Sequence, residues 1–178
     1  MVTDENYIEQ LTIQEEAGFL WTLLAEVYDP EIPVLSIIDL GIVRDILFDP
    51  LLNDAAGEWN IIITPTYSGC PAMDVIAMNI RFKLIENKIT NFRISTQLSP
   101  AWTTGWMTDA GKEKLKAYGI APPTSRSNEN LFGTVQGIEC PHCRSINTRL
   151  LSEFGSTACK SLYQCQDCRE PFDYFKCH

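Results

Sequence analysis

The sequence predicts an α+β fold, in which helices cover a small mixed sheet, followed by a β-rich module. Apolar residues recur with helical spacing in two segments, and short segments with strand character lie between and after them. A third observation sets the tail apart, because six of the seven cysteines follow residue 139. The elements of the first part run in the order α-β-β-α-β-α, which is typical of one compact domain.

The first predicted helix covers residues 14–28. It ends at residues 29–33, Asp-Pro-Glu-Ile-Pro, because each proline moves the preceding residue out of helical geometry. Its apolar stripe consists of Phe19, Leu20, Leu23, Leu24 and Val27.

Two strands are expected next. The segment 41–49 has strand character, and a turn around Pro50 and residues 53–57 follows it. Residues 59–64 form a short β-branched run that indicates a buried strand.

A loop rich in helix breakers, residues 64–71, leads into the second helix. Pro71 suits the first helical position, where its missing N–H costs nothing, so Cys70 is expected at or beside the N-cap. Residues 92–97 alternate apolar and polar, which predicts a half-exposed strand, and a last short helix is expected at 109–118. The stripe of the second helix consists of Met73, Ile76, Ala77, Ile80 and Leu84.

We therefore expect an α+β domain over residues 1–120, a linker over 121–136 and a separate module over 137–178. The linker is indicated by its prolines, serines and asparagines. The final module is too short for a sizeable core, and such modules usually need a metal or disulfides.

Charge and hydropathy limit the partners. Residues 1–120 hold 17 acidic and 8 basic residues, whereas residues 121–178 hold 6 of each. Neither part has the basic field that attracts nucleic acid, so no nucleic-acid partner is expected. No apolar run is long enough for a membrane helix, and the first residues are acidic rather than signal-like, so we expect a cytoplasmic protein without a membrane partner.

Two CxxC turns lie in the final module, Cys140–Cys143 and Cys165–Cys168. Each turn can place two sulfurs on one tetrahedral ion, so the four cysteines predict a structural zinc site in a zinc ribbon, with short strands at 148–154, 161–164 and 172–175. Single-iron or cluster binding would use the same ligands. Three further residues of the module are of kinds that can bind a metal: Cys159, Cys177 and His178. They are either alternative ligands or ordinary residues of the ribbon.

Cys70 is the chemically suggestive residue of the first part. A helix N-terminus lowers the pKa of a thiol, which would make Cys70 a metal ligand or nucleophile. The plainer interpretation is a small buried residue that ends a loop. Asp29, Glu31 and Asp39 could support a metal there, or could stabilise turns. Both histidines lie in the tail, so no base accompanies Cys70 and a stand-alone thiol enzyme is disfavoured.

Trp102 and Trp106 lie in an apolar loop, residues 99–107. They are expected either to cover the edge of the sheet or to bind a protein partner.

Segments 29–33, 38–43 and 64–71 resemble the signatures of the iron–sulfur assembly domain found in SufT-like proteins. Together with residues 99–107 and the tail segments 154–160 and 170–178, the chain resembles the PaaD (PaaJ) family. That family supplies one of the components of phenylacetyl-CoA epoxidase systems, which act in the degradation of an aromatic compound.

The resemblance implies an accessory role. In such systems a di-iron subunit epoxidises the ring, and a flavin and iron–sulfur reductase supplies the electrons. This sequence has neither a di-iron helix pattern nor a nucleotide fingerprint, so no activity of its own is expected.

The expected task is to mature or maintain the metal centre or cluster of an oxygenase or reductase partner. Carried over by position, Cys70 is the candidate ligand for iron or a transient cluster. A cluster bridged by two Cys70 thiolates would need a homodimer. The alternative is a structural docking subunit of the oxygenase complex that carries no metal beyond zinc.

Overall fold

The computed structural model describes residues 4–51, 57–123 and 137–176, with side chains in the first helix from Thr12 onward. The chain divides into two compact units, Met1–Trp102 and Thr103–His178. None of the helices in these described ranges is long and apolar enough to cross a membrane.

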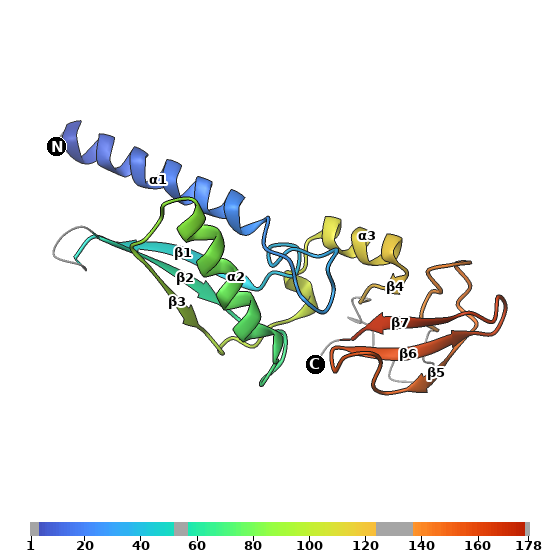
Figure 1. The fold of residues 1–178 in the computed structure, drawn as a ribbon. Coiled ribbons are helices and arrows are strands. Elements are labelled where there is room, and N and C mark those ends of the chain that lie inside the picture. Colours follow the sequence, from blue (N-terminus) through green and yellow to red (C-terminus); the bar gives the residue numbers. More distant parts are fainter. Residues whose placement is uncertain (1–3, 52–56, 124–136, 177–178) are drawn as a thin grey trace. The chain divides into compact units, whose positions relative to one another are not determined.

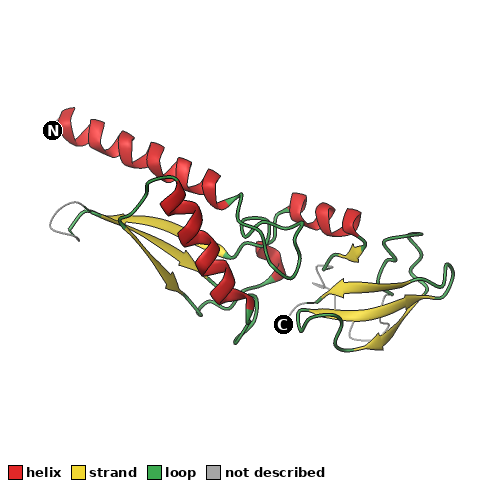
Figure 2. Cartoon of the chain, in the orientation of Figure 1, coloured by secondary structure: helices red, strands yellow, loops and turns green. Residues whose placement is uncertain are grey.

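The N-terminal unit is a three-stranded sheet with two helices on one face (Figures 1 and 2). Helix α1 (Asp4–Leu24) precedes strands β1 (Val43–Asp49) and β2 (Glu58–Ile63), which pair antiparallel. Helix α2 (Ala72–Glu86) then crosses over to β3 (Phe92–Thr96), which pairs parallel with β2. A parallel pair requires a crossover of this kind, and β2 consequently lies in the centre of the sheet.

The core of this unit lies between the helices and one face of the sheet. Every second residue of β2 is buried, namely Trp59, Ile61 and Ile63. The four buried residues of α2 are four positions apart, which keeps them on one side of the helix. These residues are Ala72, Ile76, Ile80 and Leu84.

Carboxylates close the loop between α1 and β1. Asp29 Oδ1 accepts the backbone N–H groups of Glu31 and Ile32, both at 2.8 Å. Asp39 Oδ2 accepts the N–H and hydroxyl of Ser36, both at 3.0 Å, and the Asp39 N–H donates back to Ser36 Oγ. Both aspartates are buried, so they stabilise the loop as local backbone caps.

The C-terminal unit begins with a short 3₁₀ turn, η1 (Thr104–Trp106), and helix α3 (Asp109–Tyr118). Thr108 Oγ1 caps α3 by accepting the N–H of Gly111 at 2.9 Å, and Gly119 ends it in the left-handed conformation at φ 92°.

A four-stranded sheet follows, in the spatial order β4-β7-β6-β5. Its strands are β4 (Ile120–Ala121), β5 (Thr148–Ser152), β6 (Lys160–Cys165) and β7 (Pro171–Phe175). Strand β4 is parallel to β7, and the other neighbours are antiparallel. A small core beneath the sheet contains Ala121, Ile138, Cys140, Cys165, Phe172 and Tyr174.

The predicted fold class is confirmed: small sheets are combined with helices, and a β-rich cysteine module follows. Helix α1 begins ten residues earlier than expected and ends at Leu24 rather than at residue 28. It has no proline or glycine before Gly18 to interrupt it. Its end tightens into shorter-range bonds, in which Glu26 N–H donates to Leu23 O and Val27 N–H to Leu24 O.

The division into units differs from the boundary expected after residue 120. It falls between Trp102 and Thr103, because β4 pairs with β7 and joins α3 to the C-terminal sheet. Ala121 is a buried strand residue, and the expected linker beyond residue 123 lies outside the described residues.

Candidate functional site

The four cysteines of the two CxxC turns meet in the C-terminal unit. Cys140, Cys143, Cys165 and Cys168 place their sulfurs within 4.8 Å of one another. The Cys140–Cys168 and Cys143–Cys165 sulfur pairs are 3.8 and 3.5 Å apart. A tetrahedral zinc ion with bonds of about 2.3 Å separates its sulfurs by about 3.8 Å. The donor set and its spacing therefore fit such a metal ion.

The two turns have the same backbone design. Cys140 N–H donates to Ser145 O at 2.9 Å, and Cys165 N–H donates to Glu170 O at 3.0 Å, five residues on in each case. The residue after each CxxC is an arginine with positive φ, Arg144 at 64° and Arg169 at 68°. Each turn thus bends back on itself and directs both of its sulfurs to the same point. The repeated Cys-x-x-Cys-Arg pattern was the sequence signal for this pair of arginines.

Hydrogen bonds brace one turn against the other. The Asp167 carboxylate accepts hydrogen bonds from Ser145 Oγ at 2.5 Å and from Asn147 Nδ2 at 2.9 Å, and these bonds hold its pKa below the usual range. The backbone N–H of Gln166 donates to Asn147 O at 2.8 Å. The sequence analysis did not identify these residues, which fix the ligands from outside the metal site.

Four adjacent thiols cannot all ionise without a cation. The N–H groups of Cys168 and Asp167 donate to the Cys165 sulfur and lower its pKa to about 7. The N–H of Glu170 acts in the same sense on Cys168, but burial and the other thiols outweigh it and raise the pKa of Cys168 to about 12. A divalent metal ion would relieve this repulsion by binding the four sulfurs as thiolates.

Of the three remaining residues of metal-binding type, Cys159 is described by the structure and is not part of this cluster. Cys159 is buried, its sulfur lies 3.0 Å from Thr157 Oγ1, and its carbonyl accepts the N–H of Lys176 at 3.1 Å. It is therefore a residue of the ribbon's interior rather than a fifth ligand in the described cluster. Cys177 and His178 lie outside the described residues.

Cys70 lies in the loop between β2 and α2, two residues before the helix begins. The turn forms because Gly69 takes positive φ at 83°, and the Cys70 carbonyl accepts the N–H of Met73 in the first turn. The sulfur is half-buried and receives hydrogen bonds from the Ala72 N–H and from the side chains of Tyr67 and Thr66.

The thiol chemistry of Cys70 differs from the expectation. Burial raises the pKa of Cys70 above its ordinary value, and this effect exceeds the lowering by the three hydrogen-bond donors. The nearby negative charge of Glu31 raises it further. The N–H of Ala72 at the helix N-terminus does lower this pKa as predicted, but the burial of the sulfur outweighs it, so the predicted net direction is wrong.

The three predicted supporting carboxylates have different positions. Glu31 is the one whose charge acts on Cys70. Asp29 and Asp39 instead cap the loop between α1 and β1. Beside the Cys70 loop, the hydroxyl of Thr64 at the end of β2 is buried and has no hydrogen-bond partner among the residues that the structure describes.

The two tryptophans predicted to bind a partner differ in how far they are exposed to solvent. Trp102 is 4% exposed, and its indole N–H donates to Leu40 O at 2.8 Å, so it anchors the loop before β1 and is not available to a partner. Trp106, at the end of η1, is partly exposed and remains a docking candidate.

Each of the two units contains a segment that matches the model of a known protein family. Residues 20–87 match the model of the iron-sulfur cluster assembly protein, and residues 124–176 match the PaaD zinc beta ribbon domain. A protein of Escherichia coli K12, provisionally named as the D component of 1,2-phenylacetyl-CoA epoxidase, is 51% identical over 159 residues, which are 89% of this chain and 91% of that protein. The chain belongs to the PaaD family.

Other relatives match about half of this PaaD-family chain. An Fe-S protein maturation auxiliary factor of Porphyromonas gingivalis is 32% identical over 94 residues, which are 52% of this chain and 84% of that protein. The crystal structure of a DUF59 domain from Bacillus anthracis aligns with a TM-score of 0.50 and 26% identity, covering 57% of this chain and 92% of the other. The chain therefore combines an assembly-type domain with the PaaD zinc ribbon.

Proposed function

We propose that this PaaD-family chain is an accessory subunit of a phenylacetyl-CoA epoxidase system and matures or maintains a metal centre of a partner subunit. Its cargo is iron or an iron–sulfur cluster, its client is an oxygenase or reductase subunit, and it has no turnover of its own. The observation that carries the proposal is Cys70, a half-buried thiol at the start of α2 in a domain that resembles a maturation factor.

The surroundings of Cys70 suit a ligand that holds a metal temporarily. The Ala72 N–H and the side chains of Tyr67 and Thr66 would stabilise the thiolate when iron displaces its proton. When the metal leaves, burial favours the neutral thiol, which is a poor nucleophile. A cluster bridged by two chains through Cys70 would require a homodimer.

The ribbon has a separate role in this proposal. Its four cysteines would hold a structural zinc ion in a closed site, which supplies folding free energy and leaves no open position for a substrate. The ribbon would then present a rigid surface to the partner, in the cytoplasm.

The test compares wild type with Cys70→Ser in cells that depend on the epoxidase system. We expect epoxidase activity and the cluster content of the partner to fall at least tenfold, while the purified variant keeps its zinc and its melting temperature. The matched control is Ser68→Ala, a small change in the same loop that leaves Cys70 in place. Normal cluster content in the partner without Cys70 would refute the maturation role.

A docking subunit without metal transfer is the second candidate, and the outer face of α2 favours it. Four apolar residues on that face are 38% to 64% exposed, opposite the buried stripe of the same helix: Val75, Met78, Phe82 and Ile85. Such a face is typical of an interaction surface. A stoichiometric complex with full activity in the Cys70→Ser variant would support this candidate over the first.

A further inference from the structure

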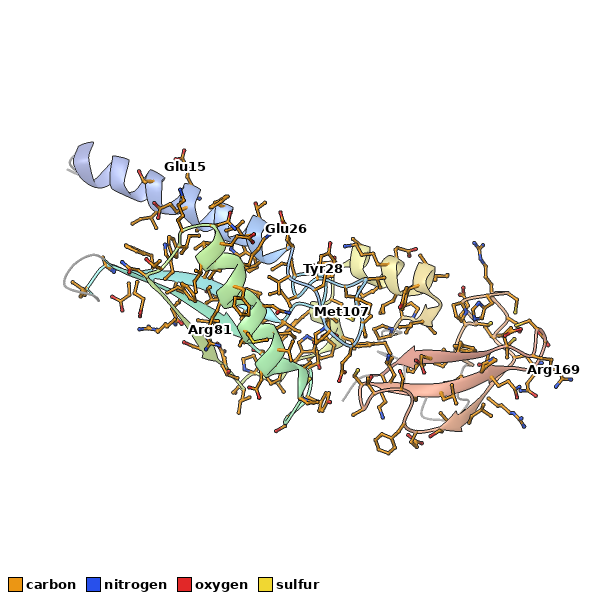
Figure 3. All side chains as sticks on the ribbon, viewed as in Figure 1. Glu15, Glu26, Tyr28, Arg81, Met107 and Arg169 are labelled. Atoms are coloured by element: carbon orange, nitrogen blue, oxygen red, sulfur yellow. The ribbon has the colours of Figure 1, made fainter. Side chains whose placement is uncertain are left out.

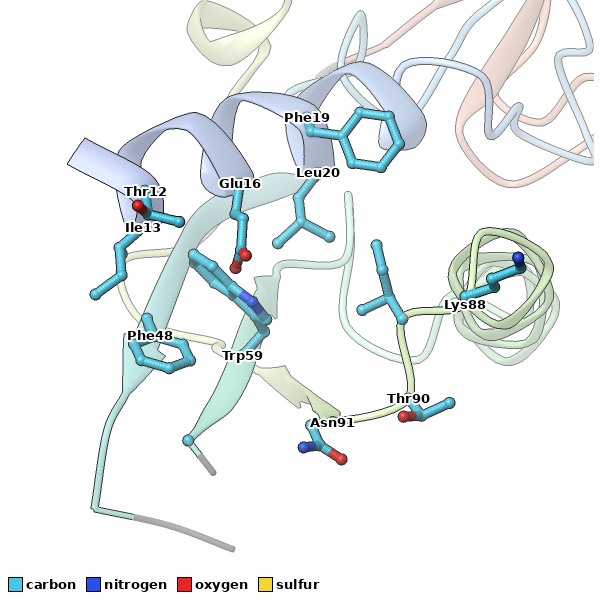
Figure 4. Close-up of a pocket in the computed structure, with 12 residues that line it drawn as sticks. Thr12, Ile13, Glu16, Phe19, Leu20, Phe48, Trp59, Lys88, Thr90 and Asn91 are labelled. Carbon is cyan, nitrogen blue, oxygen red and sulfur yellow. The ribbon is translucent and has the colours of Figure 1, made fainter. Parts of the chain in front are cut away.

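A cavity of about 660 Å³ lies at one end of the N-terminal unit (Figure 4). Helix α1 forms one side, the end of β1 and the start of β2 form the floor, and residues 88–91 close the far side. Strand β2 runs from this cavity toward the loop that carries Cys70, so the cavity is separate from the candidate metal ligand. Its volume is in the range of small-ligand pockets.

The floor of the cavity is aromatic and is held in place by its neighbours. The rings of Phe48 and Trp59 are 5.0 Å apart at an angle of 51°. Gly57 has a positive φ of 72°, and a side chain at this position would collide with the Phe48 ring. Phe19 and Leu20 extend the apolar surface along α1. The pocket is therefore formed in the absence of any ligand.

The polar and charged side chains that line the cavity are those of Thr12, Glu16, Lys88, Thr90 and Asn91. Figure 4 shows Glu16 reaching from α1 toward the Trp59 ring, with Lys88 on the far side at the end of α2. Trp59 is 6% exposed, and its indole nitrogen is not among the fully buried polar atoms that lack a partner in the described residues, so this N–H is within reach of solvent in the cavity. A ligand in the cavity could therefore place a carbonyl-type acceptor on this N–H.

The charge of the unit selects a cation. Residues 1–102 contain 15 acidic and 5 basic residues, a net charge of -10, whereas residues 103–178 contain 8 acidic and 9 basic residues. Helix α1 contains acidic residues and no basic residue. The electrostatic field of this acidic unit attracts cations and repels anions. Aromatic faces beside a carboxylate favour a planar guanidinium, which stacks on rings and pairs with oxygen atoms.

We propose that this cavity binds an arginine side chain of a partner protein. The guanidinium lies against the Phe48 ring and pairs with the Glu16 carboxylate, and a peptide carbonyl accepts the Trp59 indole N–H. This interaction does not involve Cys70 and does not depend on metal transfer.

The test uses Nα-acetyl-arginine amide as the probe and the ¹⁵N-labelled full chain, followed by NMR at constant ionic strength. We expect saturable shifts of the Trp59 indole resonance and of the Gly57 and Asn91 amides, with Kd on the order of 1 mM for a ligand of this size. Nα-acetyl-citrulline amide, which has the same shape without the charge, should bind at least fivefold more weakly.

The variant Glu16→Gln should weaken binding of the arginine probe by about threefold to fivefold, as expected for a partly exposed ion pair. The matched control is Glu15→Gln, which removes the same charge from a side chain that points away from the sheet in Figure 3. Equal binding of citrulline, equal effects of the two substitutions, or shifts outside the cavity would overturn the proposal.

Discussion

Cys70 shows how burial can outweigh a helix N-terminus. Three donors favour its thiolate, but the partly buried sulfur and the charge of Glu31 favour the thiol, and the balance raises its pKa. Because the pKa of Cys70 is raised in the folded state, the contribution of its neutral thiol to the free energy of unfolding is fully present below the ordinary cysteine pKa. It is lost as the pH rises from that value through the folded-state pKa.

We predict that alkylation of Cys70 by iodoacetamide has its midpoint at a higher pH than alkylation of an unfolded peptide of residues 64–75. The thiolate is the reactive form, so the raised pKa slows the reaction at neutral pH. Mass spectrometry of the Cys70 peptide measures the rate separately from the ribbon cysteines. A midpoint at or below that of the peptide would contradict the prediction.

At the scale of the element, β6 and β7 share an ion pair that is buried at Lys160 and partly exposed at Asp173. Lys160 Nζ lies 3.7 Å from Asp173 Oδ2, with side chains 7% and 22% exposed. Ser156 Oγ donates to the same carboxylate oxygen at 3.1 Å, and Gly155 leaves room for it, because a Cβ there would lie 2.7 Å from Asp173 Oδ1. Each charge therefore depends on the other for its burial.

We expect Asp173→Ala to lower the free energy of unfolding of the metal-loaded ribbon by about 3 kcal/mol, because it leaves the Lys160 ammonium buried without its carboxylate. Ser156→Ala, which removes one neutral donor, should cost about 1 kcal/mol. Chemical denaturation followed by circular dichroism measures both values. Similar losses in the two variants would show that the ion pair is not important for stability.

Local patterns were sufficient to predict most elements. The alternation over residues 92–97 and the stripe of α2 depend on neighbours in sequence, and both elements lie where they were expected. Strand β4 could not be predicted in this way, because it has only two residues and its partner β7 is distant in sequence, with Ile120 paired to Asp173.

The same limit explains the errors at the candidate sites. The CxxC spacing identifies all four clustered sulfurs, since each pair is local. The burial of Trp102 depends on Leu40, 62 residues away, and the pKa of Cys70 depends on Glu31 from another loop. Neither contact leaves a local pattern in the sequence.

At the scale of the whole molecule, the two units have different sources of stability. The N-terminal unit has a core of helix and strand residues, whereas the ribbon packs a small core around its own cysteines, including Cys140 and Cys165. Modules of this size usually need a metal ion or disulfides to fold, and the four clustered sulfurs provide a site for such an ion.

We predict that a strong zinc chelator unfolds the C-terminal unit and leaves the N-terminal unit folded. Hydrogen exchange should show loss of protection in β5, β6 and β7 and unchanged protection in β1, β2 and β3. Cys165→Ser should have the same effect without chelator. Loss of protection in both units together would contradict independent folding.

The pairing of β4 with β7 has a consequence for synthesis of the chain on the ribosome. Strand β4 and the preceding α3 emerge early, but the structure gives β4 no sheet neighbour other than β7 among the described strands. Both CxxC turns emerge before β7 does. All four sulfurs therefore leave the ribosome ahead of the strand that joins α3 to the sheet. Capture of a metal ion by the two turns therefore does not require that β4 has first paired with β7.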